Sequence, residues 1–320
     1  MKTVIRIGTR GNTLALYQAE LVKAQILKDF SLLSVEIVKI KTSGDMIRRG
    51  KTLLFEAKRN YTREIEEALL RSEIDLAVHS ANDLASHLPE GLKIGAVLER
   101  EDPRDCLVSK DKKKLAELPA GACIGASTLR RERQLLKRNP GFIVKELHGN
   151  VETRVRKIAS GEYDAIVLSY AGLKRLSLLN YITEIFPEKS FYPAPGQGTI
   201  AVQSRVGDTG VGEILGAIHH LPSGQRLECE RAFLMGLGGE CQMPCGISTV
   251  IQGNRISATG ALFATEGHES VEAEYEGASN RAAEVGQTLA RLILDKGGRS
   301  ILDQIRKWAV TKKPRAGGTG

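Results

Sequence analysis

The chain has 320 residues, 42% of them hydrophobic, and a formal net charge of +8 at neutral pH. This length and composition predict a globular protein of two or three domains, and no apolar run approaches the roughly 18 residues of a membrane span. Five scattered cysteines argue against a disulfide framework, and residues 1–6 lack the apolar core of a signal peptide, so we expect a cytoplasmic protein.

Short apolar strands alternate with amphipathic helices through the first two thirds of the chain. This alternation favours an α/β architecture with mixed or parallel sheets. The expected strands cover residues 4–7, 35–40, 76–78, 92–97, 143–147 and 165–168. Apolar residues at spacings of three and four predict helices over residues 14–27, 63–71, 129–138 and 151–159.

The order of elements changes after Pro222. The expected elements are a helix over 226–237, a glycine-rich loop, strands over 247–251, 256–263 and 270–275, and helices over 278–295 and 300–310. This order predicts a compact α+β domain with an antiparallel sheet. The glycine-rich and basic tail that follows is expected to be disordered.

The glycine-rich loop carries Cys241. Glycines adopt backbone angles that other residues resist, and Pro244 stiffens the exit, so the loop can present the thiol outward. A lone cysteine is more often inert and buried, and both interpretations stay open at this point. Cys241 and Cys245 lack a second ligand pair, so no metal site is expected.

Asp83 lies in a polar turn directly after the apolar run over residues 76–78. Because α/β sheets bind ligands beyond the carboxyl ends of their strands, Asp83 is a candidate cleft residue. The alternative is a turn or a helix cap, which is a common role of aspartate.

Several junctions between strands and helices carry arginine. Residues 127–131 read Ser-Thr-Leu-Arg-Arg. Arg154 lies one turn inside the helix that Asn150 is expected to cap, and Arg10 follows the first expected strand. Free N–H groups at a helix start favour an anion, and arginine adds bidentate hydrogen bonds. Each junction alone could equally be an ordinary capped helix with solvated arginines. Together they predict a cleft for a ligand with several negative groups.

The positive charge has three interpretations, namely nucleic acid, an anionic membrane surface and small acidic ligands. Aromatic residues make up only 5% of the chain, and the sequence lacks a zinc-finger spacing or an aromatic-basic RNA-binding motif. Small anions are therefore the expected ligands, and neither nucleic acid nor a membrane is an expected partner. Nucleic-acid binding is kept as an alternative hypothesis, which predicts an affinity for DNA or RNA that falls steeply with salt concentration.

An ordered series of segments at consistent spacing resembles the porphobilinogen deaminase (hydroxymethylbilane synthase) family, from about Arg6 to the last helix. Among these segments are Val78-His79-Ser80 with Asp83, Leu129-Arg130-Arg131, Gly149-Asn150 with Thr153-Arg154, Pro195-Gly196-Gln197-Gly198, and Cys241 with Pro244. The resemblance implies two periplasmic-binding-protein-like (type II) α/β domains and a smaller C-terminal α+β domain. The expected boundaries are 1–98 with 199–217, 104–192, 222–311 with the cysteine loop, and a disordered tail over 312–320.

The resemblance also implies an activity. Family members polymerise four porphobilinogen molecules into hydroxymethylbilane, with release of ammonia, on a dipyrromethane cofactor held by a thioether to the loop cysteine, here Cys241. Every pyrrole carries acetate and propionate, so the growing chain needs fixed cations. Asp83 would be the catalytic carboxylate, which stabilises cationic pyrrole N–H groups and moves protons. We expect a monomer that acts on this small-molecule substrate.

The remaining site residues are carried over from the family by position. The implied cofactor contacts, besides the covalent Cys241, are Ser127, Thr128, Arg130, Arg131, Lys58 and His148. The implied substrate contacts are Arg10, Arg154, Arg175 and Gln197.

The chain departs from the family pattern around the expected cofactor contacts. Asn82 stands where lysine usually precedes the aspartate, His148 where arginine usually precedes Gly149-Asn150, and Glu240 where glycine usually precedes the cysteine. A stretch that usually reads Lys-Gly-Leu-Phe is Lys-Arg-Asn-Tyr over residues 58–61. These changes motivate a second hypothesis, a non-catalytic or weakly active paralogue that binds a tetrapyrrole precursor or another polyanion in the same cleft.

Overall fold

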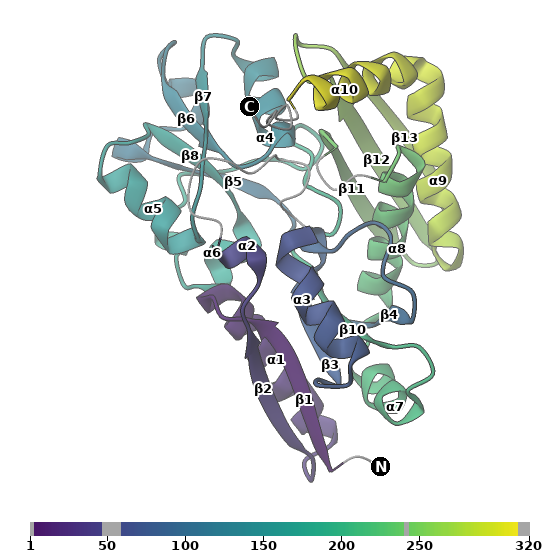
Figure 1. Ribbon diagram of the computed structural model, residues 1–320. Helices are drawn as coiled ribbons and strands as arrows, with labels where there is room; N and C mark the ends of the chain where they lie inside the picture. Colours follow the sequence, from purple (N-terminus) through teal and green to yellow (C-terminus); the bar gives the residue numbers. More distant parts are fainter. Residues whose placement is uncertain (1–2, 47–58, 240–242, 313–320) are drawn as a thin grey trace, which may run out of the picture.

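The computed structural model describes residues 3–46, 59–239 and 243–312, which form three sheets covered by helices (Figure 1). The first sheet has the order β2-β1-β3-β10-β4. Its strands are β1 (Val4–Arg10), β2 (Ser34–Ile40), β3 (Leu76–Ser80), β4 (Leu92–Val97) and β10 (Ile200–Arg205). Strand β1 is parallel to β2 and β3, whereas β10 is antiparallel to β3 and β4. The chain therefore returns, after a long excursion, to the interior of its first sheet.

Helices cover both faces of this first sheet. Helices α1 (Thr13–Asp29) and α7 (Thr209–Ile218) share one apolar cluster with β1 and β3, and α3 (Arg59–Leu70) packs on the opposite face. The short helix α2 (Ser43–Met46) contacts α3. Asn12 caps α1, because its side-chain oxygen accepts from the Ala15 N–H at 3.0 Å. The cap fixes the start of α1 directly after β1.

The second sheet has the same kind of mixed order, β7-β6-β8-β5-β9. Its strands are β5 (Asp105–Ser109), β6 (Cys123–Ala126), β7 (Ile143–Glu146), β8 (Ala165–Ser169) and β9 (Glu184–Ile185). Its helices are α4 (Leu129–Arg138), α5 (Val151–Ala159) and α6 (Tyr170–Arg175). Helix α4 packs on one face, and α5 and α6 pack on the other.

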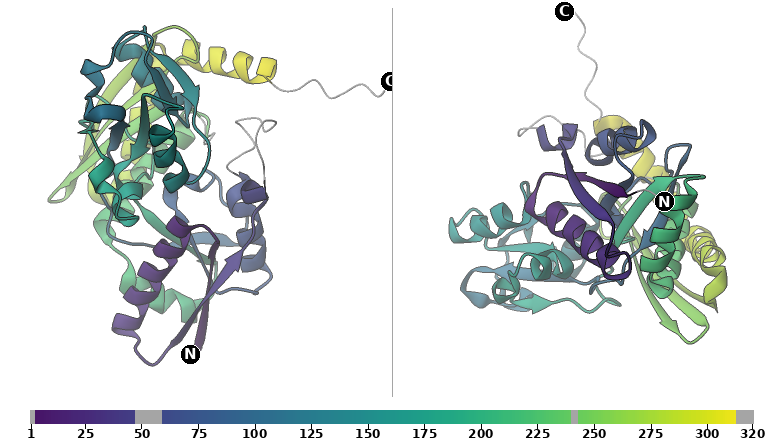
Figure 2. Two further views of the ribbon diagram at one scale, coloured as in Figure 1. Left: turned by 90° about the vertical axis from the view of Figure 1, so that its left-hand side faces the viewer. Right: turned by 90° about the horizontal axis from the view of Figure 1, so that it is seen from below.

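The third sheet is antiparallel, with β12 between β11 and β13. Its strands are β11 (Cys245–Gln252), β12 (Arg255–Phe263) and β13 (Ser270–Ala278), and its helices are α8 (Leu221–Gly236), α9 (Ala282–Ile293) and α10 (Arg299–Lys312). The left view in Figure 2 places the first sheet at one end of the molecule and the other two sheets at the opposite end. Within the described ranges, none of the helices has the length and apolarity to cross a membrane.

The predicted fold class is confirmed. Two mixed sheets with helices on both faces, linked by two chain crossings, form a pair of periplasmic-binding-protein-like domains, and the third sheet forms the smaller α+β domain. The domain boundaries remain predictions. Residue 312 ends α10, and residues 313–320 lie outside the described residues.

Several element predictions were incomplete. Helix α8 begins at Leu221, before the expected start at residue 226, since Pro222 occupies the first turn, where its missing N–H is not needed. Helix α9 begins at Ala282 and not at residue 278, because β13 continues to Ala278. The elements that were not predicted are β5, β6, β9, β10, α2, α6 and α7.

Candidate active site

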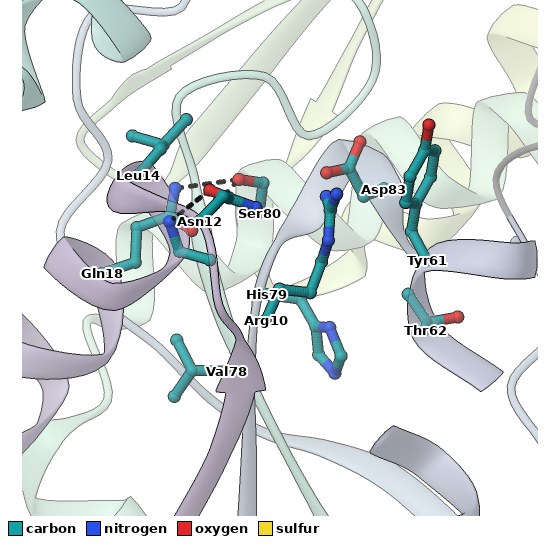
Figure 3. Close-up of a pocket in the computed structure, with 11 residues that line it drawn as sticks. Arg10, Asn12, Leu14, Gln18, Tyr61, Thr62, Val78, His79, Ser80 and Asp83 are labelled. Atoms are coloured by element: carbon teal, nitrogen blue, oxygen red, sulfur yellow. Dashed lines mark hydrogen bonds between the residues drawn. The ribbon is translucent and has the colours of Figure 1, made fainter. Parts of the chain in front are cut away.

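A pocket opens at the carboxyl ends of β1 and β3 (Figure 3). Arg10 ends β1, and Asp83 ends a three-residue 3₁₀ turn, Ala81–Asp83, that follows β3. The lining residues come from β1, α1, α3, β3 and this turn, and they are Arg10, Asn12, Leu14, Ala15, Gln18, Tyr61, Thr62, Val78, His79, Ser80 and Asp83. In Figure 3 the Arg10 side chain points toward Asp83. The sequence prediction placed Asp83 after the carboxyl end of a strand, and the structure shows it there.

Aromatic and amide side chains support this pocket. The Arg10 Cζ lies 4.2 Å from the centroid of the Tyr61 ring, which is a cation–π contact. Across the pocket, Gln18 Nε2 donates to Ser80 Oγ at 2.8 Å and ties α1 to β3. No sequence pattern indicated the contact between Arg10 and Tyr61, because this contact joins segments far apart in the chain.

His79 lies beneath Arg10 in the pocket. Its side chain is 5% exposed, and among the described residues its Nε2 has no hydrogen-bond partner. Burial, reinforced by the positive charge of Arg10, lowers the pKa of His79 to about 4. The imidazole is therefore neutral at physiological pH.

Acid should destabilise the fold through His79. Its pKa is about 4 in the folded protein, against 6.5 for the ordinary value, so the unfolded chain binds the proton first. The contribution of the neutral His79 to the free energy of unfolding is fully present above pH 6.5 and is lost as the pH falls toward 4. From pH 7 to pH 5, we expect the wild type to lose about 2 kcal/mol more free energy of unfolding than His79→Gln.

Urea unfolding at the two pH values measures this difference. The exposed His268 supplies a control, because His268→Gln should follow the wild type. An equal loss of stability in the wild type and His79→Gln would contradict the expectation.

Arg130 and Arg131, in the first turn of α4, surround the buried carboxylate of Asp105. Arg130 Nη1 lies 2.6 Å from Asp105 Oδ2, and Arg131 Nη2 lies 2.8 Å from Oδ1. Gln197 Nε2 donates to the same Oδ1 at 3.0 Å, and Arg130 Nη1 also donates to the Tyr192 carbonyl at 2.6 Å. The two guanidinium groups hold the pKa of Asp105 below its usual range despite its burial. Arg130 and Gln197 are thus engaged with protein groups.

Ser127 links Arg131 to Arg154. Its hydroxyl oxygen accepts from Arg131 Nη1 at 3.0 Å and from Arg154 Nη1 at 3.3 Å. Burial and the positive charge of Arg131 lower the pKa of Arg154 to about 10, while the negative charge of Asp83 acts in the opposite direction. Among the described residues, no carboxylate forms an ion pair with Arg154. The guanidinium groups of Arg154 and Arg131 lie side by side at the Ser127 hydroxyl, and such a pair favours the binding of an anion.

The structure describes two further residues of the predicted site, Thr128 and His148. Thr128 caps α4, because its Oγ1 accepts from the Arg131 N–H at 3.3 Å. His148 is exposed, with its Nε2 at 3.2 Å from Glu146 Oε2. Lys58 and Cys241 lie outside the described residues.

Arg175 lies in a different pocket. Its Nη2 donates to the Gly198 carbonyl at 2.7 Å, and its neighbours there include Tyr17 and Leu21 of α1. Leu14, Ala15 and Gln18 of the same helix line the pocket of Arg10 and Asp83. Helix α1 therefore separates the Arg175 pocket from the one that contains Asp83.

The sequence patterns did not indicate Asp105 as the partner of Arg130 and Arg131. A pair of buried arginines requires a buried counter-charge, and the acidic run over residues 99–105 contained it. Without the pairing of β5 with β8, nothing in the sequence distinguished Asp105 from Asp102, which forms an ion pair with Arg104 at 2.6 Å.

Two periplasmic-binding-protein-like α/β domains, with a carboxylate in a pocket of the first and linked arginines on the second, define the class of this protein. Residues 5–213 match the family model described as "Porphobilinogen deaminase, dipyromethane cofactor binding domain", and residues 225–295 match "Porphobilinogen deaminase, C-terminal domain". The chain belongs to the porphobilinogen deaminase family. It is accordingly an enzyme, a transferase with dipyrromethane as its cofactor.

Curated relatives cover nearly the whole chain. Porphobilinogen deaminase of Thermus thermophilus is 44% identical over 95% of this chain and 99% of its own length. Porphobilinogen deaminase of Syntrophomonas wolfei is 43% identical over 95% and 99%. Among solved structures, the periplasmic aliphatic sulphonate binding protein of Escherichia coli aligns with a TM-score of 0.41 and 14% identity over 73% of this chain and 70% of its own.

Proposed function

We propose that this enzyme joins four porphobilinogen molecules into hydroxymethylbilane, with release of ammonia, on a dipyrromethane primer bound through a thioether to Cys241. The observation that supports this most directly is the set of charged groups at two places, Asp83 and Arg10 in the pocket at the carboxyl ends of β1 and β3, and Arg131 and Arg154 on either side of the Ser127 hydroxyl. Such an arrangement suits a substrate that carries carboxylates and develops positive charge during the reaction.

The residues of the cleft fit a dipyrromethane. Its pyrroles carry acetate and propionate, and Arg154, which shares the Ser127 hydroxyl with Arg131, offers a guanidinium group that no carboxylate of the described residues pairs with. When bound, the dipyrromethane supplies the pyrrole carbon at which the chain grows. Arg130, Gln197 and Thr128 support these contacts indirectly, because they fix Asp105 and the start of α4.

Asp83 handles protons on the substrate. Its carboxylate stabilises positive charge on the pyrrole N–H while ammonia leaves, and then takes up the proton released after the new carbon–carbon bond forms. Arg10, oriented by the Tyr61 ring, binds a substrate carboxylate at the same pocket. Lys58 and His148 as cofactor contacts, and Arg175 as a substrate contact, stay predictions.

Intact-mass measurement tests the tether. The wild type incubated with porphobilinogen should carry a covalent dipyrrole adduct, whereas Cys241→Ser should carry no adduct and form no hydroxymethylbilane. Cys123→Ser, which changes a partly exposed thiol on β6, should behave as the wild type. An adduct on Cys241→Ser, or an unmodified wild type, would contradict the proposal.

We also propose that the protein is a cytoplasmic monomer without nucleic-acid affinity. Arg130 and Arg131 are buried and held by Asp105 and Ser127, which favours a small ligand over a nucleic-acid backbone. A flat binding titration with DNA and RNA at low salt supports this view, because phosphate-backbone binding is strongest there.

The named relatives favour the enzyme over the non-catalytic alternative.

A further inference from the structure

The turn that carries Asp83 depends on outside support. It spans three residues, Ala81–Asp83, and such a short 3₁₀ segment has little stability of its own. On its amino-terminal side, the Ala81 N–H donates to the Thr199 carbonyl at 2.9 Å. Gly196 lies so close that a Cβ there would be 3.1 Å from the Ala81 carbonyl carbon. The entry of the turn is therefore fixed against the segment that leads into β10.

Helix α8 of the third domain holds the other side of the turn. Arg231 Nη2 donates to the carbonyl oxygens of Ala85 at 2.9 Å and Ser86 at 2.7 Å. Leu227, one helical turn earlier on the same face, packs in one apolar cluster with Ala81 and Leu84. Two carbonyls of an irregular loop are satisfied by one guanidinium, so the exit of the Asp83 turn is set by α8.

The same loop contacts the chain beyond α8. Ser86 Oγ donates to the carbonyl oxygen of Gly239, which follows the helix and precedes Cys241 by two positions in the sequence. Gly239 has φ of 75°, and a Cβ there would lie 3.2 Å from Ser86 Oγ. Both the positive φ and the close approach favour glycine. The residues after Asp83 are thus held in place both by α8 and by the segment that follows α8.

We propose that Arg231 is a positioning residue for the reaction: through the carbonyls of Ala85 and Ser86 it sets the place of Asp83 relative to α8. The inference rests on the proposed role of Asp83. The carboxylate belongs to the first domain, whereas α8 belongs to the third, whose loop carries the proposed tether. A misplacement of about 1 Å between reacting groups can lower a rate by about 100-fold.

Steady-state kinetics of Arg231→Gln and Arg231→Lys test the inference. Arg231→Gln should lower kcat by about 10- to 100-fold with a smaller change in KM, because substrate contacts remain. Arg231→Lys should restore part of kcat, since an ammonium group still donates hydrogen bonds. The cofactor adduct, measured by intact mass, should match the wild type. Arg299→Gln, at an exposed arginine of α10, is the matched control.

A double-mutant cycle separates positioning from general loss of structure. In the Asp83→Asn background, Arg231→Gln should cause no further loss of kcat, since the group that it positions is already gone. Equal fold losses in both backgrounds, or wild-type kcat in Arg231→Gln, would overturn the inference alone. Full activity of Asp83→Asn would instead overturn the proposed function of Asp83.

Arg231→Met covers the case in which Arg231→Gln does not fold. It keeps a long apolar side chain on α8 and removes both hydrogen bonds to the Ala85 and Ser86 carbonyls. A fall in kcat that disappears in the Asp83→Asn background supports the inference. A fall that persists there, or no fall, overturns it.

Discussion

Asp83→Asn is expected to lower kcat by about 10²- to 10⁴-fold, the range that general acid–base groups usually contribute. Asparagine keeps the size of the side chain but carries no charge and takes up no proton. The turn that holds residue 83 is fixed by Ala81 and Leu84 through their backbone, so the fold should survive the change.

The rate of hydroxymethylbilane formation at saturating porphobilinogen measures this effect, with the thermal unfolding midpoint as a check on folding. Asp303→Asn, at an exposed carboxylate of α10, is the control and should keep the wild-type rate. A wild-type kcat in Asp83→Asn would remove Asp83 from the chemistry.

Glu230→Gln is expected to lower the free energy of unfolding by about 3–5 kcal/mol, because it leaves the buried charge of Arg100 without its partner. The two side chains are 0% and 2% exposed, with Arg100 Nη1 at 2.5 Å from Glu230 Oε1. The same carboxylate accepts from the Gly196 N–H at 2.7 Å and from Thr249 Oγ1 at 2.6 Å. It therefore joins both chain crossings between the first two domains to α8 and β11.

Urea unfolding of Glu230→Gln, Arg100→Gln and the double variant tests this prediction. The double variant should be more stable than either single one, since it leaves no uncompensated charge. Glu284→Gln breaks an exposed ion pair with Arg281 and should cost at most about 1 kcal/mol. A comparable small cost for Glu230→Gln would show that the buried carboxylate does not hold the domains together.

The sequence predicted the fold class because most elements show a clear period. Strands β5, β6 and β10 escaped prediction because they are buried on both faces and lack the alternation that marks a half-buried strand, and β9 has only two residues. All five residues of β5, from Asp105 to Ser109, are buried, and β6 has only four residues. Periodicity also does not show which strands are neighbours, so the place of β10 required the structure.

The candidate site was predictable where it followed from strand ends. Arg10 is the last residue of β1 and Asp83 follows the end of the neighbouring β3, and the α/β rule places a ligand at these strand ends. The sequence did not show which arginines pair with a buried carboxylate and which one lies in a separate pocket. This difference depends on Asp105 of β5, which pairs with Arg130 and Arg131 of α4, and on α1, which places Arg175 in a separate pocket.

The position of β10 in the first sheet has a consequence for synthesis on the ribosome. Strands β3 and β4 are made early, but the strand that lies between them ends at Arg205. The second sheet is continuous in the chain from β5 to β9, so all its strands emerge before β10 does. Translation therefore delivers a complete second sheet while the first still has a gap, and the amino-terminal domain is expected to finish folding after its neighbour.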